Sequence, residues 1–462
     1  MSSGPRQSEQ PGAPQAKLAR RLGLFDATMI VMGGIIGSGI FINYYVVAQV
    51  VHTPVLILGA WLAGGVIALA GAFIYAELAD RMPQVGGQYA YIREAYHPSV
   101  AFVYGWGLLL VTQTGGMAAV SIAFARYTIE LTGTHAPDWL LAVIVLAVLT
   151  VVNCMGVRMG GTVQDVLMVL KIGAIAALVL AGFALVHPSQ WSWHPAMDRP
   201  MSGSFISAFA AAMVPVLFSY GGWQTSCFVA GEMRDPRRDL PRGLLIGVVG
   251  VILLYLSAGF VYVRALGAAG LAVTSTPASS VMRLALGEPG AKLIAAGIAI
   301  SGLGFLSQGI LTAPRVYFAM ADDGLFFRAL AWVHPRTRVP VVAIVVQSVW
   351  TIVIALSGRY EQILNYVVAT DFIFFGLSAT CLFVFRHRDR VRGESWSGYR
   401  VPGHPFTTFA FVAVSWLVVL NTMIRYPKDS LVGTAILLAG ITVYFIWGRR
   451  RSRWRQPQSN EP

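Results

Sequence analysis

Residues 32–41 read Met-Gly-Gly-Ile-Ile-Gly-Ser-Gly-Ile-Phe and interrupt an apolar segment that begins near Leu24. Four glycines fall within the seven positions from Gly33 to Gly39. Each glycine in a helix interior costs about 1 kcal/mol relative to alanine, so a continuous helix is disfavoured here. Close packing of an unbroken helix through the GxxxG spacing of Gly33 and Gly37 is the alternative explanation.

A similar interruption occurs later, where residues 218–224 read Phe-Ser-Tyr-Gly-Gly-Trp-Gln within another apolar segment. Unpaired backbone groups inside a bilayer cost several kcal/mol each, so helix breaks persist there only where they line a site. The two breaks lie five predicted spans apart. An odd number of crossings inverts the second half relative to the first, which predicts two inverted repeats of five spans, each beginning with a discontinuous helix.

The composition predicts an all-α integral membrane protein. Hydrophobic residues make up 56% of the 462 residues and charged residues 12%, about half the charge content of an average soluble domain. Apolar runs of about 20 residues match the length that crosses a hydrocarbon core of about 30 Å. About twelve spans are expected, the last two outside the repeats. They begin near Leu24, Val55, Val100, Trp139, Val163, Phe205, Gly243, Lys292, Val341, Gln362, Pro405 and Leu431.

The net charge of +13 is explained by membrane topology rather than by nucleic-acid binding. If the N-terminus is cytoplasmic, most of the 34 Lys and Arg residues fall in cytoplasmic segments. This bias follows the positive-inside rule and predicts a multi-pass protein of the cytoplasmic membrane with both termini in the cytoplasm. The expected organisation is a disordered cytoplasmic tail (1–22), a ten-helix core (23–390), two further helices (391–448) and a basic cytoplasmic tail (449–462).

Broken helices offer backbone groups to a ligand. A half-helix that begins after Gly37-Ser38-Gly39 presents free N–H groups and a positive dipole end, which favour a carboxylate. The carbonyls expected to be unpaired, and to favour an ammonium group, belong to Ile35, Phe218, Ser219 and Gly221. A pocket with both corners suits the shared part of an α-amino acid, and backbone recognition avoids burying charged side chains.

Three motifs resemble those of the amino acid–polyamine–organocation superfamily, and within it the L-type amino acid transporter branch. They are 34–41 (GIIGSGIF), 77–92 (ELADRMPQVGGQYAYI), and 218–223 (FSYGGW) followed by 231–233 (GEM) and 236–242 (PRRDLPR). The resemblance extends from about Leu22 to Trp447. It implies a LeuT-type fold, with discontinuous first and sixth helices in two five-helix inverted repeats, and alternating-access transport of L-amino acids by exchange or facilitated movement.

The resemblance also implies roles for individual residues. The residues implied to bind substrate are Ile35, Ser38, Gly39, Phe218, Ser219, Gly221 and Trp223. Phe218 would also close over the substrate as an outer gate. Trp223 would wall the side-chain pocket, although an aromatic residue near a helix break is also a common packing residue.

Lys171 lies in an otherwise apolar stretch, residues 166–185. A charge at this depth costs at least about 2.5 kcal/mol, so Lys171 should face the protein interior. In similar transporters a lysine here takes the place of a sodium ion between the first and eighth helices, which implies sodium-independent transport. There are two alternatives. The lysine extends to the membrane–water interface, or it loses and regains a proton and so couples transport to protons.

Asp371 lies well inside the tenth predicted span. It either reads the substrate side chain, pairs with a cation, or caps an irregularity in its helix. Gln113, Ser307 and Gln308 are further polar candidates, although polar residues between membrane helices often serve only to join them.

Other functions are disfavoured. The eight histidines are scattered, and neither metal-ligand spacing nor a phosphate-binding loop is present, so no enzyme, cofactor or metal is expected. Residues 130–138 contain no cysteine and the chain has no Asn-x-Ser/Thr sequon, so no disulfide-linked glycoprotein subunit is expected. Proton-coupled symport of an amino acid or amine, and a non-transporting amino acid sensor, remain alternatives. The sequence does not specify which amino acids bind.

Overall fold

The computed structural model describes residues 20–187, 193–197, 200–357, 360–425 and 427–454, and these are folded into a helical bundle. The elements assigned to the membrane are, in chain order, α1 (Leu24–Ile35) with α2 (Gly39–Ala48), α3 (Pro54–Arg81), α5 (Pro98–Gly107) with the π-helical turn η1 (Leu108–Thr112) and α6 (Gln113–Thr132), α7 (Asp138–Cys154), α8 (Val157–Leu185), α9 (Gly203–Tyr220) with the 3-10 helix η2 (Trp223–Glu232), α10 (Pro236–Val273), α11 (Pro277–Thr312), α13 (Val341–Ser357), α14 (Tyr360–Arg392), α15 (Phe406–Arg425) and α16 (Pro427–Trp454). Shorter helices between them are α4 (Gln88–Ala95), α12 (Pro314–Asp322) and η3 (Arg328–Ala331).

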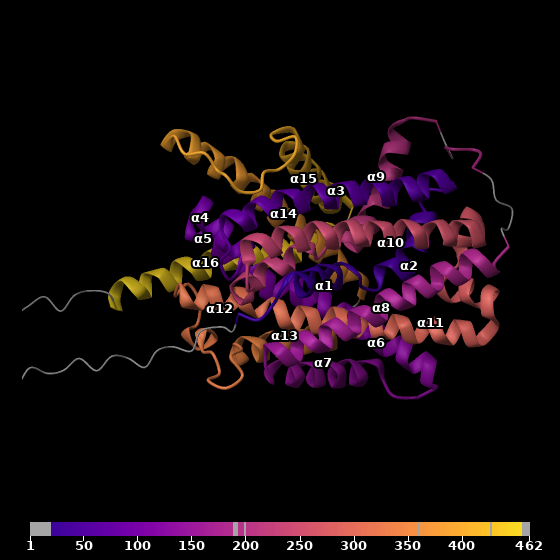
Figure 1. The fold of residues 1–462 in the computed structure, drawn as a ribbon, viewed down its shortest axis with the longest axis horizontal. Helices are drawn as coiled ribbons and strands as arrows, with labels where there is room; N and C mark the ends of the chain where they lie inside the picture. The colour runs from indigo at the N-terminus through magenta and orange to yellow at the C-terminus, as the bar shows by residue number, and fades with distance from the viewer. Residues whose placement is uncertain (1–19, 188–192, 198–199, 358–359, 426, 455–462) are drawn as a thin grey trace, which may run out of the picture.

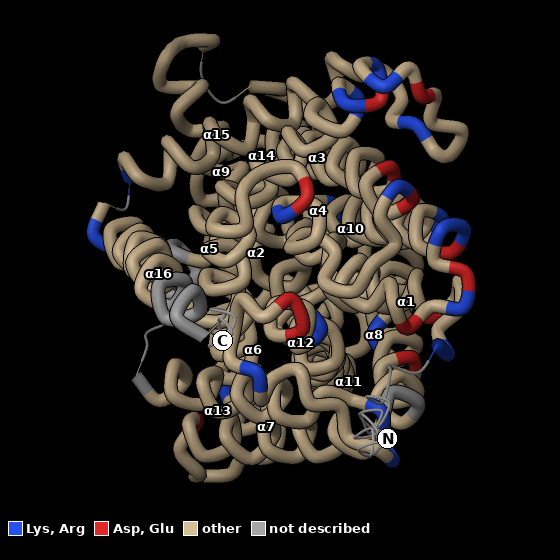
Figure 2. Tube along the Cα trace, turned by 90° about the vertical axis from the view of Figure 1, so that its left-hand side faces the viewer, with Lys and Arg blue, Asp and Glu red and all other residues tan. Residues whose placement is uncertain are grey.

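The number of spans agrees with the sequence. Within the described residues, nine helical stretches are long and apolar enough to cross a membrane, and three shorter apolar helices complete a set of about twelve. The long helices run alongside one another, with α4, α12 and the end of α16 at one end of the bundle (Figure 1). Figure 2 looks onto this end and shows Lys, Arg, Asp and Glu residues gathered there.

Both predicted helix breaks are confirmed. The first span ends its initial helix at Ile35 and resumes at Gly39, with Ile36 in an extended conformation. The sixth span ends α9 at Tyr220, passes through an extended Gly221 and continues as η2. Gly222, between the two halves, has a φ of +105°, which is the left-handed region that glycine alone adopts freely.

The two breaks meet backbone to backbone. A Cβ atom at Gly222 would lie 2.0 Å from the carbonyl oxygen of Gly34, and a Cβ at Gly34 would lie 2.5 Å from the carbonyl oxygen of Gly222. Side chains are excluded from this contact on both sides. The glycines therefore let two interrupted helices touch at a distance that no other residue allows.

The motif residues at the charged end of the bundle form buried polar contacts. The backbone N–H groups of Arg21 and Leu22 donate to the carbonyl of Glu232 at 2.8 and 3.0 Å. The Glu232 carboxylate accepts two bonds from Arg315 of α12, at 2.5 and 3.2 Å, and both side chains are fully buried. Glu77 similarly accepts bonds from Arg386 of α14.

The expected domain boundaries shift slightly. Residues 1–19 and 455–462 lie outside the described part of the chain, so most of the two predicted tails does too. Arg21 and Leu22, predicted to be in the disordered tail, are hydrogen-bonded to Glu232. The last helix continues to Trp454, past the expected boundary at 448.

Candidate functional site

A cavity of about 80 Å³ lies where the two breaks face the middle of the bundle. Its walls come from the breaks in the first and sixth spans and from the spans that contain η1, α11 and α14. The predicted substrate-binding residues that line it are Ile35, Ser38, Gly39, Phe218, Ser219, Gly221 and Asp371. Residues from distant parts of the sequence, chosen for the chemistry of helix breaks, thus share one cavity.

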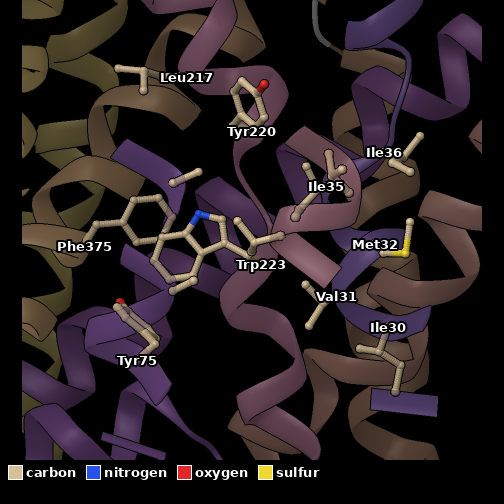
Figure 3. Close-up of a cluster of buried hydrophobic side chains, with 14 of the residues drawn as sticks. Ile30, Val31, Met32, Ile35, Ile36, Tyr75, Leu217, Tyr220, Trp223 and Phe375 are labelled. Carbon is tan, nitrogen blue, oxygen red and sulfur yellow. The ribbon is translucent and has the colours of Figure 1, made fainter. Parts of the chain in front are cut away.

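Trp223 is the predicted binding residue that does not line this cavity. Its side chain is 3% exposed and stacks on Phe375, with ring centroids 5.2 Å apart. Tyr75 packs edge-on against it at 4.6 Å, and Figure 3 shows Trp223 among these buried side chains. Phe375 is the ring that reaches the cavity wall. Trp223 therefore supports the wall from behind, as the packing alternative expected.

The structure places the start of α2, the predicted anion corner, in the lining of the cavity. Ser38 stands at the N-terminus of α2, where its side chain makes no capping hydrogen bond, and it is only 6% exposed. The first N–H groups of a helix lack partners within the helix, and a buried helix start without a cap normally needs a ligand or water. The start of α2 therefore offers N–H donors and a positive dipole end to an anion in the cavity.

The cation corner differs from the expectation, because three of its carbonyls already accept hydrogen bonds. The carbonyl of Ile35 accepts from the N–H of Gly37 at 2.9 Å, and that of Phe218 from the N–H of Gly221 at 3.1 Å. The carbonyl of Ser219 accepts from the hydroxyl of Tyr255 at 3.2 Å. Local turns thus satisfy the carbonyls of Ile35 and Phe218, and Tyr255 contacts that of Ser219. The carbonyl oxygens of Phe218 and Ser219 each have a second lone pair for a ligand, whereas that of Ile35 also faces the Tyr255 hydroxyl.

Tyr255 of α10 is a site residue that the sequence did not reveal. Its hydroxyl lies 3.1 Å from the carbonyl oxygen of Ile35 and 3.2 Å from that of Ser219, so one side chain contacts both breaks. It lies within a buried aromatic cluster with Trp61 and Tyr220. A tyrosine in an apolar span is common, and only the folded structure distinguishes this one.

We expect Tyr255→Phe to raise the substrate concentration needed for half-maximal transport several-fold while the protein accumulates normally. Loss of one hydrogen bond to a buried carbonyl is worth about 1–3 kcal/mol, and here it loosens both breaks at once. Tyr262→Phe is the control, because the Tyr262 hydroxyl has no hydrogen-bond partner among the described residues. Equal transport kinetics in the two variants would contradict this role for Tyr255.

Lys171 lies behind the first break rather than in the cavity lining. It is fully buried, and its Nζ donates to the carbonyl of Ile36. Its amine also approaches α11 closely, since a Cβ at Gly304 would lie 3.2 Å from Nζ. Ser301 of α11 donates to the carbonyl of Gly37 at 3.2 Å. Lys171 and Ser301 thus donate to adjacent carbonyls of the same break. The amine of Lys171 points into the protein and not to the membrane–water interface.

Two of the three remaining polar candidates line the cavity, and one does not. Gln113 and Gln308 line the cavity, whereas Ser307 is buried away from its lining. Gln308 donates to Thr225 at 2.5 Å, which links α11 to η2. Asp371 of α14 and Thr112 of the π-helical turn η1 both line the cavity. Within the described residues no group of three His, Cys, Asp or Glu side chains could hold a metal ion.

A bundle of about twelve apolar helices, with two interrupted helices meeting at a central cavity, defines a membrane transporter. The chain belongs to the amino acid permease family, whose sequence profile matches residues 22–447. It is 30% identical to the serine/threonine exchanger SteT of Bacillus subtilis (strain 168), over 94% of this chain and 98% of the relative. It is 28% identical to the human large neutral amino acids transporter small subunit 2, over 94% of this chain and 82% of the relative. It is 26% identical to the human b(0,+)-type amino acid transporter 1, over 97% of this chain and 92% of the relative. The protein is therefore an amino acid transporter and not an enzyme.

Proposed function

We propose that the protein exchanges L-amino acids across the cytoplasmic membrane by alternating access, without sodium. The observation that carries this proposal is the buried, uncapped start of α2, which lines the same cavity as Phe218 and Ser219, whose carbonyl oxygens each have a second lone pair. The N–H groups bind the substrate carboxylate, and the second lone pairs of the carbonyls bind its ammonium group. Side-chain contacts then come from the walls formed by η1, α11 and α14.

Phe218 is the proposed outer gate. It lines the cavity and is half-buried, and it directly precedes Ser219 at the end of α9. A substrate favours the occluded state only through contacts that it makes more strongly in that state. A phenyl ring that closes over the bound molecule supplies such contacts. Because the ring belongs to α9, it couples substrate binding to the movement of that helix.

Sodium independence rests on Lys171. Its buried amine supplies a positive charge between the first break and α11, where Ser301 contacts the neighbouring carbonyl. A bound metal cation here would bring the same charge to the same carbonyls. We propose a fixed structural cation at this position, with a lysine that loses and regains a proton, and so drives symport, as the alternative.

The proposed topology has the charged end of the bundle in the cytoplasm. This end carries the Glu232–Arg315 and Glu77–Arg386 pairs together with the basic segments that the positive-inside rule assigns to the cytoplasm. The protein is proposed to act without a disulfide-linked subunit, because residues 133–137, between α6 and α7, contain no cysteine.

The test is uptake of labelled amino acids, one at a time, into proteoliposomes of the purified protein in sodium-free buffer. We expect uptake only when unlabelled amino acid is present inside, because an exchanger reorients slowly when empty. Uptake into empty vesicles would replace exchange with facilitated transport. A requirement for a pH gradient would instead establish proton symport, and a requirement for sodium would overturn the role proposed for Lys171.

We expect Lys171→Ala to reduce the rate of exchange by about tenfold or more while protein abundance changes little. The substitution leaves the Ile36 carbonyl buried without its donor, which costs about 1–3 kcal/mol at the first break. Lys292→Ala is the control, because Lys292 is exposed on α11. Exchange kinetics that match those of the unmodified protein would remove Lys171 from the mechanism.

A further inference from the structure

The cavity contains a carboxylate whose counter-charge is not supplied by its walls. Asp371 is the only charged residue among the described residues that line the cavity. Lys171 lies outside that lining and directs its amine to the carbonyl of Ile36. Thr112, whose hydroxyl is a neutral donor, lines the same cavity.

An isolated carboxylate in such a place is costly unless a cation or several hydrogen bonds accompany it. One hydroxyl supplies one bond, and an ionised carboxylate accepts up to about four. Charged residues inside membrane bundles accordingly pair with one another or mark the path of a ligand or ion. Since the described residues of the walls provide no cation, a cation that completes this pair comes from outside them, as it would with a ligand.

The position of Asp371 separates it from the groups that recognise the amino acid backbone. The anion and cation corners belong to the breaks in the first and sixth spans, whereas Asp371 and Thr112 come from α14 and η1. A substrate held by its α-carboxylate and α-ammonium groups at the breaks extends its side chain toward these other walls. Phe372 and Phe375 also line this side, and aromatic faces attract cations within about 6 Å.

We propose that Asp371 and Thr112 form a side-chain subsite for a cation, so that the substrates include α-amino acids with an ammonium or guanidinium side chain. This inference rests on the proposed function, because the α-carboxylate and α-ammonium groups must first be held at the breaks. In this subsite Thr112 is a positioning residue, whose hydroxyl orients the carboxylate from the facing wall. The carboxylate itself contacts the side chain of the substrate.

The test is competition in the exchange assay. Proteoliposomes preloaded with a neutral amino acid take up the same labelled amino acid, and unlabelled lysine, arginine or norleucine is added outside. We expect lysine and arginine to compete in the unmodified protein. Asp371→Asn should weaken competition by lysine and arginine about tenfold or more, the size expected for a lost charge-assisted bond, and leave norleucine nearly unchanged. Thr112→Val should weaken cation competition by a smaller factor.

Asp138→Asn is the matched control, because Asp138 is an exposed carboxylate outside the cavity that pairs with Arg126. It should change neither kind of competition. Neutral exchange without competition by lysine or arginine would overturn the cation subsite and leave the proposed function standing. An equal loss of lysine and norleucine competition in Asp371→Asn would also overturn it and indicate a structural role. Absence of exchange for every amino acid would overturn both proposals.

Discussion

Replacing Gly222 with alanine is expected to abolish transport and to leave little folded protein in the membrane. The new Cβ atom would lie 2.0 Å from the carbonyl oxygen of Gly34 and 2.5 Å from its carbonyl carbon. These are backbone atoms of the opposite broken helix, so they cannot rotate away as a flexible side chain does. The φ of +105° at Gly222 adds about 1–3 kcal/mol for a residue with a side chain. The measurements are abundance and melting temperature of the detergent-solubilised protein, followed by exchange in proteoliposomes.

Gly59→Ala provides the matched control, because a Cβ at Gly59 meets nothing within 4 Å. It lies within α3, where alanine is favoured over glycine by about 0.5–1 kcal/mol, so the melting temperature should stay the same or rise slightly. Gly34→Ala should fail for the same reason as Gly222→Ala, since its Cβ would lie 2.5 Å from the carbonyl oxygen of Gly222. A Gly222→Ala protein with normal abundance and melting temperature would show that the two breaks do not meet as described.

Replacing Arg315 with methionine is expected to lower the free energy of unfolding by about 3–5 kcal/mol, the usual effect of removing one partner from a buried ion pair. The Glu232 carboxylate and Arg315 guanidinium are both 0% exposed, so methionine leaves a buried carboxylate without its cation. The same glutamate holds the N–H groups of Arg21 and Leu22 through its carbonyl. The effect should therefore extend to the start of the first span. Melting temperature and proteolysis at the charged end of the bundle measure both consequences.

A double-mutant cycle separates loss of the pair from loss of packing. Arg315→Met combined with Glu232→Gln should be less destabilised than the sum of the two single variants, because no uncompensated charge remains. The control is Arg283→Met, which breaks the exposed Arg283–Glu288 pair, with side chains 51% and 68% exposed. Exposed pairs contribute about 0–1 kcal/mol, so this variant should melt nearly normally. Equal destabilisation by Arg315→Met and Arg283→Met would contradict the buried pair.

Local features of the sequence predicted the helix breaks correctly. Apolar length determines which segments can cross a membrane, and glycine content determines where a helix is weak, so both can be found without knowing the neighbours of a residue. The breaks at 35–39 and 220–223 were found in this way. The start of α2 as an anion corner also follows from local geometry, because the donors of a helix N-terminus belong to the helix itself.

Whether the carbonyls at the breaks accept hydrogen bonds could not be predicted from the local sequence. Those of Ile35 and Ser219 were expected to be unpaired, and this is wrong, because the Tyr255 hydroxyl contacts both of them. Tyr255 is 220 residues away from Ile35 in the sequence. Trp223 shows the same limit: its type suggested a pocket wall, but packing against Tyr75 and Phe375 gives it a supporting position.

The sequence by itself determined that this protein is a bundle of about twelve membrane helices with two helix breaks. Only the tertiary structure decided which side chains complete the site. It brings Lys171 to a carbonyl 135 residues away and Arg315 to a carboxylate 83 residues away, and it places Asp371 and Thr112 in the lining of one cavity. The physical reason is the distance along the chain over which each effect acts. Apolar length and helix propensity act within a few turns of the chain, whereas burial and pairing of polar groups depend on which helices pack together.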